Sequence, residues 1–97
     1  RRSLASLGPG TLREQVVVIT GASSGIGRAT ALRAAARGAR LVLAARDRLG
    51  LEETAHLAER RGAPGSVAIA VADVADPDDV EAVARTAERA FGGVDTW

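Results

Sequence analysis

The amino-acid sequence predicts an α/β fold in which helices cover a parallel sheet. Short apolar runs rich in β-branched residues alternate with longer stretches of helical periodicity, and each strand–helix unit takes about 30 residues. A hairpin cannot connect parallel neighbours, so this alternation requires right-handed crossovers through the helices. A cluster of glycines follows the first apolar run, where a strand should turn into a helix.

The first strand is predicted at Gln15 to Thr20, a continuous run typical of a strand buried on both faces. An alanine-rich helix is predicted over Ile26 to Arg37, with Gly38 as its C-cap. Arg40 to Ala45 is the second predicted strand. Helical spacing predicts that the first helix buries Ile26, Ala29, Leu32 and Ala36.

A second helix is predicted over Arg48 to Arg61 and a third strand over Ser66 to Ala72. The third helix should begin at Asp76 and Pro77, an N-cap followed by proline in the first turn, and run to Phe91. Val94 to Trp97 is predicted to open a fourth strand beside the first. The pattern β-α-β-α-β-α-β therefore predicts an incomplete doubly wound domain over residues 15–97, preceded by a tail or linker at residues 1–14.

Composition excludes several classes of function. The 97 residues carry a formal charge of only +1, and no aromatic side chains interleave the scattered arginines, which argues against a nucleic-acid partner. With no cysteine and one histidine, neither a thiolate nor a histidine-based metal site is expected. The absence of cysteine favours a cytoplasmic protein. No apolar run approaches the roughly 20 residues of a membrane span.

The glycine cluster comprises Gly21, Gly25 and Gly27, between the carboxyl end of the first strand and the first helix. Free backbone N–H groups and the helix dipole favour an anion there, and a pyrophosphate is the expected ligand. Ser23 and Ser24 add hydroxyl donors. The spacing G-x-x-x-G-x-G differs from the standard dinucleotide fingerprint and from the P-loop. A glycine-rich turn with no ligand is the alternative.

The stretch "TGASSGIG" (Thr20 to Gly27) resembles the T-G-x-x-x-G-x-G element of the short-chain dehydrogenases/reductases. The resemblance continues through "LVLAARD", "ADVAD" and "FGGVD", so it covers the chain from about Gln15 onward. It implies a Rossmann-type fold in which Asp73 and Val74 meet the adenine of the cofactor, although Asp73 would also suit a turn. The cofactor-binding residues that it implies are Gly21, Ser23, Ser24, Gly25, Ile26, Gly27, Arg46, Asp73 and Val74.

The end of the second strand bears on the choice of nucleotide. An acid there would bind the ribose 2′-hydroxyl of NAD, but this sequence has Ala45 followed by Arg46, a donor suited to a 2′-phosphate. The prediction is NADP(H), with NAD less favoured. Arg46 would otherwise be an exposed loop residue, with Asp47 pairing with it or capping the next helix. Arg28 would reinforce the phosphate contact or be a solvated helix residue.

The resemblance implies hydride transfer between nicotinamide and a carbonyl or alcohol carbon, with a small-molecule substrate and a homo-oligomeric whole protein. The family's catalytic tyrosine and lysine, and the asparagines of its Asn-Asn-Ala-Gly element, have no counterpart here, because the sequence contains none of these residues. The family's catalytic serine belongs to a later strand. No catalytic residue is therefore predicted here, and the chain supplies the cofactor-binding half of an oxidoreductase. A non-catalytic dinucleotide sensor and a ketoreductase module of a larger synthase are the alternatives.

Overall fold

The computed structural model describes residues 15–97, and the predicted tail at residues 1–14 lies outside the described residues. Every predicted strand and helix before residue 92 forms, and its ends fall within about one residue of the prediction. In chain order the elements are β1 (Val16–Thr20), α1 (Gly25–Ala36), β2 (Arg40–Ala45), α2 (Arg48–Arg61), β3 (Val67–Val71) and α3 (Pro77–Phe91).

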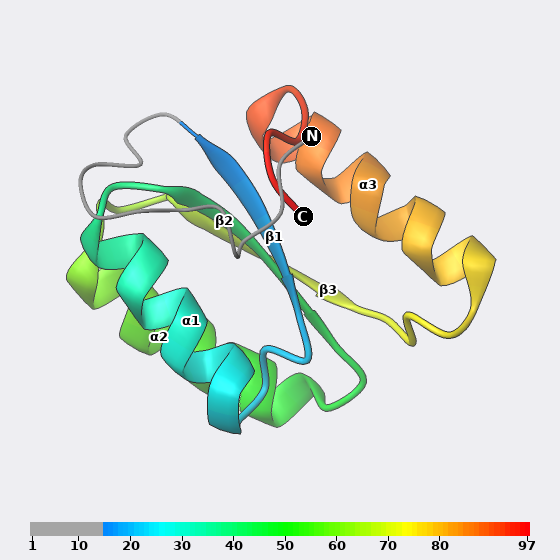
Figure 1. Ribbon diagram of the computed structural model, residues 1–97, viewed down its shortest axis with the longest axis horizontal. Coiled ribbons are helices and arrows are strands. Elements are labelled where there is room, and N and C mark those ends of the chain that lie inside the picture. The colour runs from blue at the N-terminus through cyan, green and yellow to red at the C-terminus, as the bar shows by residue number, and fades with distance from the viewer. Residues whose placement is uncertain (1–14) are drawn as a thin grey trace.

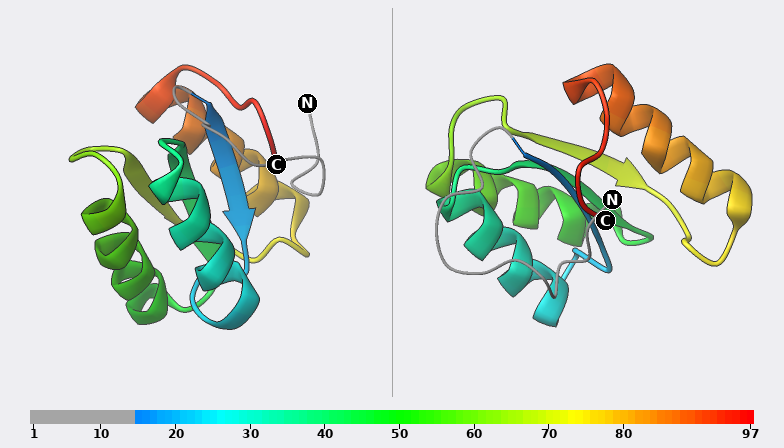
Figure 2. Two further views of the ribbon diagram at one scale, coloured as in Figure 1. Left: turned by 60° about the vertical axis from the view of Figure 1, so that its left-hand side comes forward. Right: turned by 45° about the horizontal axis from the view of Figure 1, so that its top comes forward.

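The three strands form one parallel sheet in which β2 lies between β1 and β3. In register, Val16 lies opposite Arg40, and Leu41 lies opposite Val67. α1 and α2 cover one face of the sheet and α3 covers the other (Figure 1). The turned views of Figure 2 show the same three layers. This arrangement confirms the predicted doubly wound α/β fold.

The strand side chains alternate between two cores, because successive residues of a strand point to opposite faces. On the side of α1 and α2, Val17 and Leu41 pack with the alanines of α1 and with Leu51 of α2. On the other side, Val18 and Val42 pack against α3. β1 and β2 are thus buried on both faces, whereas β3 is half-buried at the edge of the sheet.

The predicted fourth strand contributes a single parallel bridge, between Thr96 and Val17, in place of a full strand. The Val18 N–H donates to the Thr96 carbonyl at 2.8 Å, and the Asp95 N–H donates to the Val16 carbonyl at 2.8 Å. The Asp95 carboxylate also accepts from the Val16 N–H at 2.8 Å. The chain therefore returns to the side of β1 on which the fourth strand was expected.

The buried face of α1 differs from the prediction. Ile26 is 87% exposed, and Ala29 and Ala36 are also exposed. Ala31, Ala34 and Ala35 face the sheet instead, with Leu32 partly buried beside them. Alanine occurs all around this helix, so the hydrophobic pattern alone could not orient it.

The ends of α3 follow the predicted chemistry. Asp76 caps the helix, since its carboxylate accepts from the Asp78 N–H at 2.9 Å, and Pro77 stands in the first turn. At the other end Gly92 adopts a left-handed conformation, with a φ of +83°. In the described part of the chain, no helix is both long and apolar enough to cross a bilayer.

Candidate functional site

The glycine loop, defined here as residues 21–24, links the carboxyl end of β1 to the first turn of α1. Gly21 has a φ of +60° and Gly25 a φ of +59°, values that side-chain-bearing residues rarely adopt. A Cβ on either glycine would meet no other atom within 4 Å. Glycine is therefore required at these two positions by the backbone turn and not by lack of space.

Gly27 is required for a different reason, which is close packing. A Cβ on this residue would overlap the carbonyl oxygen of Gly21 and lie 2.7 Å from its carbonyl carbon. The first turn of α1 consequently rests directly on the backbone of the glycine loop. No larger residue fits without moving one of the two segments.

The amino terminus of α1 is left open. Ser24 occupies the N-cap position with an extended backbone, but its side chain makes no capping hydrogen bond, and the first turn contains no acid. The first N–H groups of a helix have no partner within the helix. Those of Gly25, Ile26 and Gly27 therefore point out of a helix end that carries a partial positive charge. Such an end suits an anion.

Arg28 makes contacts within the protein that neither expectation for it included. Its side chain is only 24% exposed and pairs with Glu53 at 2.7 Å. Its Nε donates to the Thr54 hydroxyl at 2.8 Å, and one terminal nitrogen donates to the Ser23 carbonyl at 2.6 Å. Arg28 therefore ties the glycine loop to α2.

Gly50, in the first turn of α2, is a residue that sequence reasoning missed. A Cβ here would lie 2.8 Å from the Ser23 carbonyl oxygen and 2.9 Å from the Ser23 Cβ. The glycine loop thus packs directly on the start of α2. A glycine inside a helix costs about 1 kcal/mol relative to alanine, and that unexplained cost in the sequence was the available signal.

After β2, the chain presents an arginine that forms no ion pair with the described residues. Ala45 is buried at the strand end, and Arg46 is exposed, with no ion pair to any residue in the range 15–97. Asp47 caps α2, since its carboxylate accepts from the Gly50 N–H at 3.2 Å. Of the two predicted alternatives for Asp47, capping is the one that the structure supports.

After β3, two carboxylates shape the loop that carries Asp73 and Val74. Asp73 accepts from the Ala75 N–H at 2.9 Å, which is the predicted turn contact. Its own N–H donates to the carboxylate of Asp79, in the first turn of α3, at 2.7 Å. Val74 is 47% exposed, although it is apolar. The loop is therefore braced by α3 and offers an apolar surface next to an acid.

These three loops surround one hollow of about 550 Å³ at the carboxyl ends of the strands. It brings together five of the nine predicted site residues. The other four are not among its lining residues: Ser24 is the N-cap of α1, and Gly25, Ile26 and Gly27 form the first turn of that helix. Within residues 15–97, no group of three or more His, Cys, Asp or Glu side chains could hold a metal ion. The hollow is lined by Gly21, Ser23, Ala45, Arg46, Asp47, Ala72, Asp73, Val74 and Ala75.

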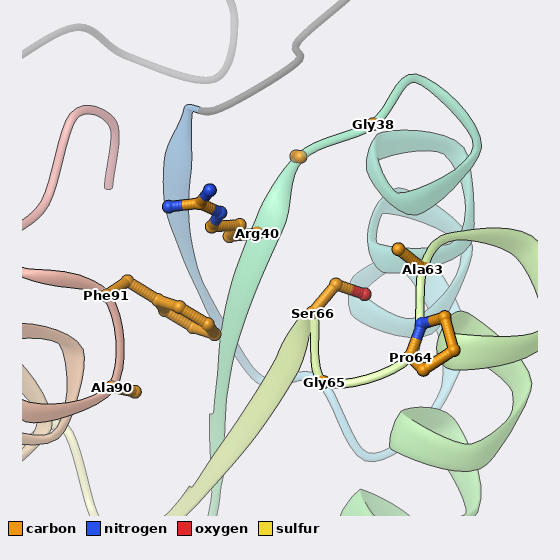
Figure 3. Close-up of a pocket in the computed structure, with 9 residues that line it drawn as sticks. Gly38, Arg40, Ala63, Pro64, Gly65, Ser66, Ala90 and Phe91 are labelled. Carbon is orange, nitrogen blue, oxygen red and sulfur yellow. The ribbon is translucent and has the colours of Figure 1, made fainter.

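A second hollow, also of about 550 Å³, lies at the opposite, amino ends of the strands. Figure 3 shows Arg40 at the start of β2 and Phe91 at the end of α3 beside it. The turn through Pro64 and Gly65 closes another side. None of the predicted site residues lines this hollow.

Comparison with known proteins gives consistent matches along the described chain. The model of the family described as short chain dehydrogenase matches residues 15–97. The chain is 51% identical, over 88 residues, to the uncharacterised oxidoreductase YxnA of Bacillus subtilis; the match covers 89% of this chain and 24% of the relative. It is 45% identical over 91 residues to a Streptomyces violaceoruber protein named as a ketoacyl reductase of the granaticin polyketide synthase, covering 94% and 33%.

The fold also matches solved structures of other proteins. The crystal structure of L-sorbose reductase from Gluconobacter frateurii, complexed with NADPH and L-sorbose, aligns with a TM-score of 0.81 and 40% identity. That alignment covers 88% of this chain and 32% of the reductase. The chain thus spans between 24% and 33% of the length of these three relatives.

Proposed function

Because this chain belongs to the short chain dehydrogenase family, we propose that it is the dinucleotide-binding part of a longer, NADP(H)-dependent oxidoreductase. The relatives are oxidoreductases, which supports the general class of the reaction. The observation that carries the proposal is the meeting of three loops at one hollow: the glycine loop, the loop with Arg46 and the loop with Asp73. Each would hold a different part of one dinucleotide.

The pyrophosphate would lie at the first turn of α1. Its backbone N–H groups have no capping side chain, and Gly27 keeps the loop and helix close together. Several N–H groups and the helix dipole act together there, each dipole contact adding about 0.3–1 kcal/mol. The adenine would lie on the other side of the hollow, where Val74 offers an apolar surface and Asp73 a carboxylate oxygen.

The 2′-phosphate of NADP(H) would pair with Arg46. Its guanidinium is exposed at the hollow, and no acid among residues 15–97 forms an ion pair with it. The carboxylate of the next residue, Asp47, caps α2 by accepting from the Gly50 N–H at 3.2 Å. The NADPH in the related L-sorbose reductase adds support for NADP(H) over NAD.

Bound NADP(H) would supply or accept a hydride at a carbonyl or alcohol carbon of a small-molecule substrate. The chain itself has no tyrosine or lysine, so the proposal assigns it the binding and orientation of the cofactor. The acid–base residues would belong to the rest of the protein. The predicted cytoplasmic location and homo-oligomeric assembly stay predictions.

A ketoreductase module of a larger synthase is the second candidate function. The similarity to the protein named as a ketoacyl reductase of a polyketide synthase favours it. In that case residues 1–14 would be an interdomain linker. The length of the complete protein, and the domains beside this one, would separate a module from a free-standing reductase.

The test is a calorimetric titration of the complete protein with NADPH and with NADH. We expect NADPH to bind at least about tenfold tighter, because one charge-assisted contact contributes about 1.5–3 kcal/mol. Arg46→Asp should abolish or invert this preference. The matched control is Arg40→Asp, the same change at the other end of β2, which should leave it intact. Binding of neither nucleotide would overturn the proposal, and equal binding would overturn the choice of NADP(H).

A further inference from the structure

Arg28 joins the glycine loop to α2 through one guanidinium group. One terminal nitrogen donates to the Ser23 carbonyl in the glycine loop at 2.6 Å and to the Gly50 carbonyl in α2 at 3.3 Å. The other terminal nitrogen and Nε bind Glu53 and Thr54, also on α2, at 2.7 Å and 2.8 Å. The glycine loop and α2 are therefore held at one separation by a single side chain.

The acceptors on α2 are well placed for this role. Thr54 is completely buried, so its hydroxyl depends on Arg28 for a partner in place of water. Gly50 has no side chain, which lets the Ser23 carbonyl approach α2 closely enough to share Arg28 with it. The charge of Arg28 is balanced by the exposed carboxylate of Glu53. Arg28 makes four hydrogen bonds, all to the glycine loop and α2, so its connection to the proposed nucleotide site runs through these two segments.

The connection extends to the residue proposed to choose the nucleotide. Gly50 receives the Arg28 hydrogen bond at its carbonyl and donates its N–H to Asp47 at 3.2 Å. Asp47 directly follows Arg46 in the chain. A continuous set of contacts thus runs from the glycine loop, through Arg28 and the first turn of α2, to the loop that carries Arg46.

We propose that Arg28 is a positioning residue for nucleotide selectivity, which holds the glycine loop and the Arg46 loop at the spacing that one NADP(H) molecule must bridge. This inference rests on the proposed function. The pyrophosphate and the 2′-phosphate belong to one covalent molecule, so a relative shift of the two loops prevents both contacts from forming at once. NADH has no 2′-phosphate and loses only the pyrophosphate part.

Lysine cannot replace arginine in this role. The guanidinium is a planar fork whose donors face Ser23, Thr54 and Glu53 at once. An ammonium group is a point donor at the end of a flexible stem and would lose at least one of these acceptors. Arg28→Lys keeps the charge and the helix while it breaks the link, which makes it the informative variant.

The experiment measures the dissociation constants of NADPH and NADH for the complete protein and its variants. Arg28→Lys should weaken NADPH binding more than NADH binding and reduce the ratio of the two constants by at least about fivefold, or about 1 kcal/mol. Arg33→Lys, the same change at an exposed position of α1, is the matched control and should leave the ratio unchanged. In an Arg46→Ala background, Arg28→Lys should no longer change the ratio, because the two effects are coupled.

Thr54→Val serves if Arg28→Lys does not fold, since it removes one acceptor of Arg28 at nearly constant volume. It should lower the ratio in the same direction. A purely structural Arg28 would lower the melting temperature and leave the ratio as in the wild type, and that result overturns the inference while the proposed function stands. If the wild-type protein itself shows no preference for NADPH, the choice of NADP(H) in the proposed function fails, and the inference fails with it.

Discussion

The two ends of the sheet carry hollows of nearly the same size and opposite chemistry. Each has a volume of about 550 Å³. All three helices begin at the carboxyl ends of the strands and end at their amino ends (Figure 1). The N-termini of the helices, with their free N–H groups, therefore lie at the hollow beside the carboxyl ends of the strands. The C-termini, with their free carbonyl groups, lie at the hollow beside the amino ends. The helix dipoles favour an anion at the carboxyl-end hollow and disfavour one at the amino-end hollow, so the volume of a hollow alone does not locate a phosphate site.

The three helix starts at the carboxyl end also differ among themselves. Asp47 caps α2, and Asp76 caps α3, whose first turn contains two more acids. Only α1, among the described helices, begins with neither a capping side chain nor an acid. Carboxylates occupy the other two helix ends, so among the described helices the N-terminus of α1 is the one best suited to an anion.

The strongest test of this contrast is Gly27→Ala. The added Cβ overlaps the Gly21 carbonyl, so the loop or the helix must move. We expect the free energy of unfolding to fall by about 1–3 kcal/mol and nucleotide affinity to fall by at least about tenfold. Chemical denaturation and calorimetry of the complete protein measure the two effects.

Gly65→Ala is the matched control for that variant at the amino end. Its φ of +77° makes alanine strained, but a Cβ there meets nothing within 4 Å. It should cost about 1–2 kcal/mol of stability and leave the nucleotide dissociation constants unchanged. Equal losses of affinity in the two variants would contradict the assignment of the site to the carboxyl ends.

Phe91→Ala probes the amino-end hollow directly. Phe91 packs against the core between the sheet and α3 and is partly buried. Its removal should lower the free energy of unfolding by about 2 kcal/mol, because apolar area is lost from that core. The NADPH dissociation constant, measured on the folded variant, should stay within about twofold of the wild type. A large loss of NADPH binding would show that the two ends are not independent.

Ser24→Asp sharpens the comparison among the helix starts. An aspartate at the N-cap should stabilise α1 by up to about 1 kcal/mol in the free protein. The same carboxylate would repel a pyrophosphate, and affinity should fall by about tenfold. The variant would thus be more heat-stable and bind more weakly. Tighter binding in this variant would argue against a pyrophosphate at this end of α1.

The smallest effect is expected from Asp79→Ala. It removes the acceptor for the Asp73 N–H and frees the loop beside the proposed adenine site. NADPH and NADH should both bind about three- to fivefold more weakly, with their ratio unchanged. Asp76→Ala, which removes only the cap of α3, is the control. It should cost about 1 kcal/mol of stability and little affinity.

The strands and helices were predictable because their signals are local. β-branched runs mark β1 and β2, and Asp76 followed by Pro77 marks the start of α3, so these boundaries follow from neighbouring residues. The orientation of α1 was not predictable, since alanines occur on all sides of the helix and form no single apolar stripe. Tertiary packing alone selects Ala31, Ala34 and Ala35 as its inner face.

The candidate site was predictable where it depends on backbone chemistry. The left-handed turn at Gly21 and the close approach at Gly27 both follow from glycine at a strand-to-helix junction. The role of Arg28 was not predictable, because its acceptors on α2 lie 22 to 26 residues further along the chain. A spacing of that length carries no periodic signal, and only the folded packing of α1 on α2 brings the groups together.

The contacts between β1 and residues 95–96 can form only after most of the chain has been synthesised. The Val16 N–H donates to the carboxylate of Asp95, which lies 79 residues further along the chain. A ribosome adding about 5–20 residues per second needs roughly 4–16 s to make that stretch. During this interval the outer edge of β1 has no native partner from this segment, although β2 can already pair with its inner edge. We therefore expect a nascent chain arrested before Asp95 to bind chaperones more strongly than one arrested well beyond Trp97.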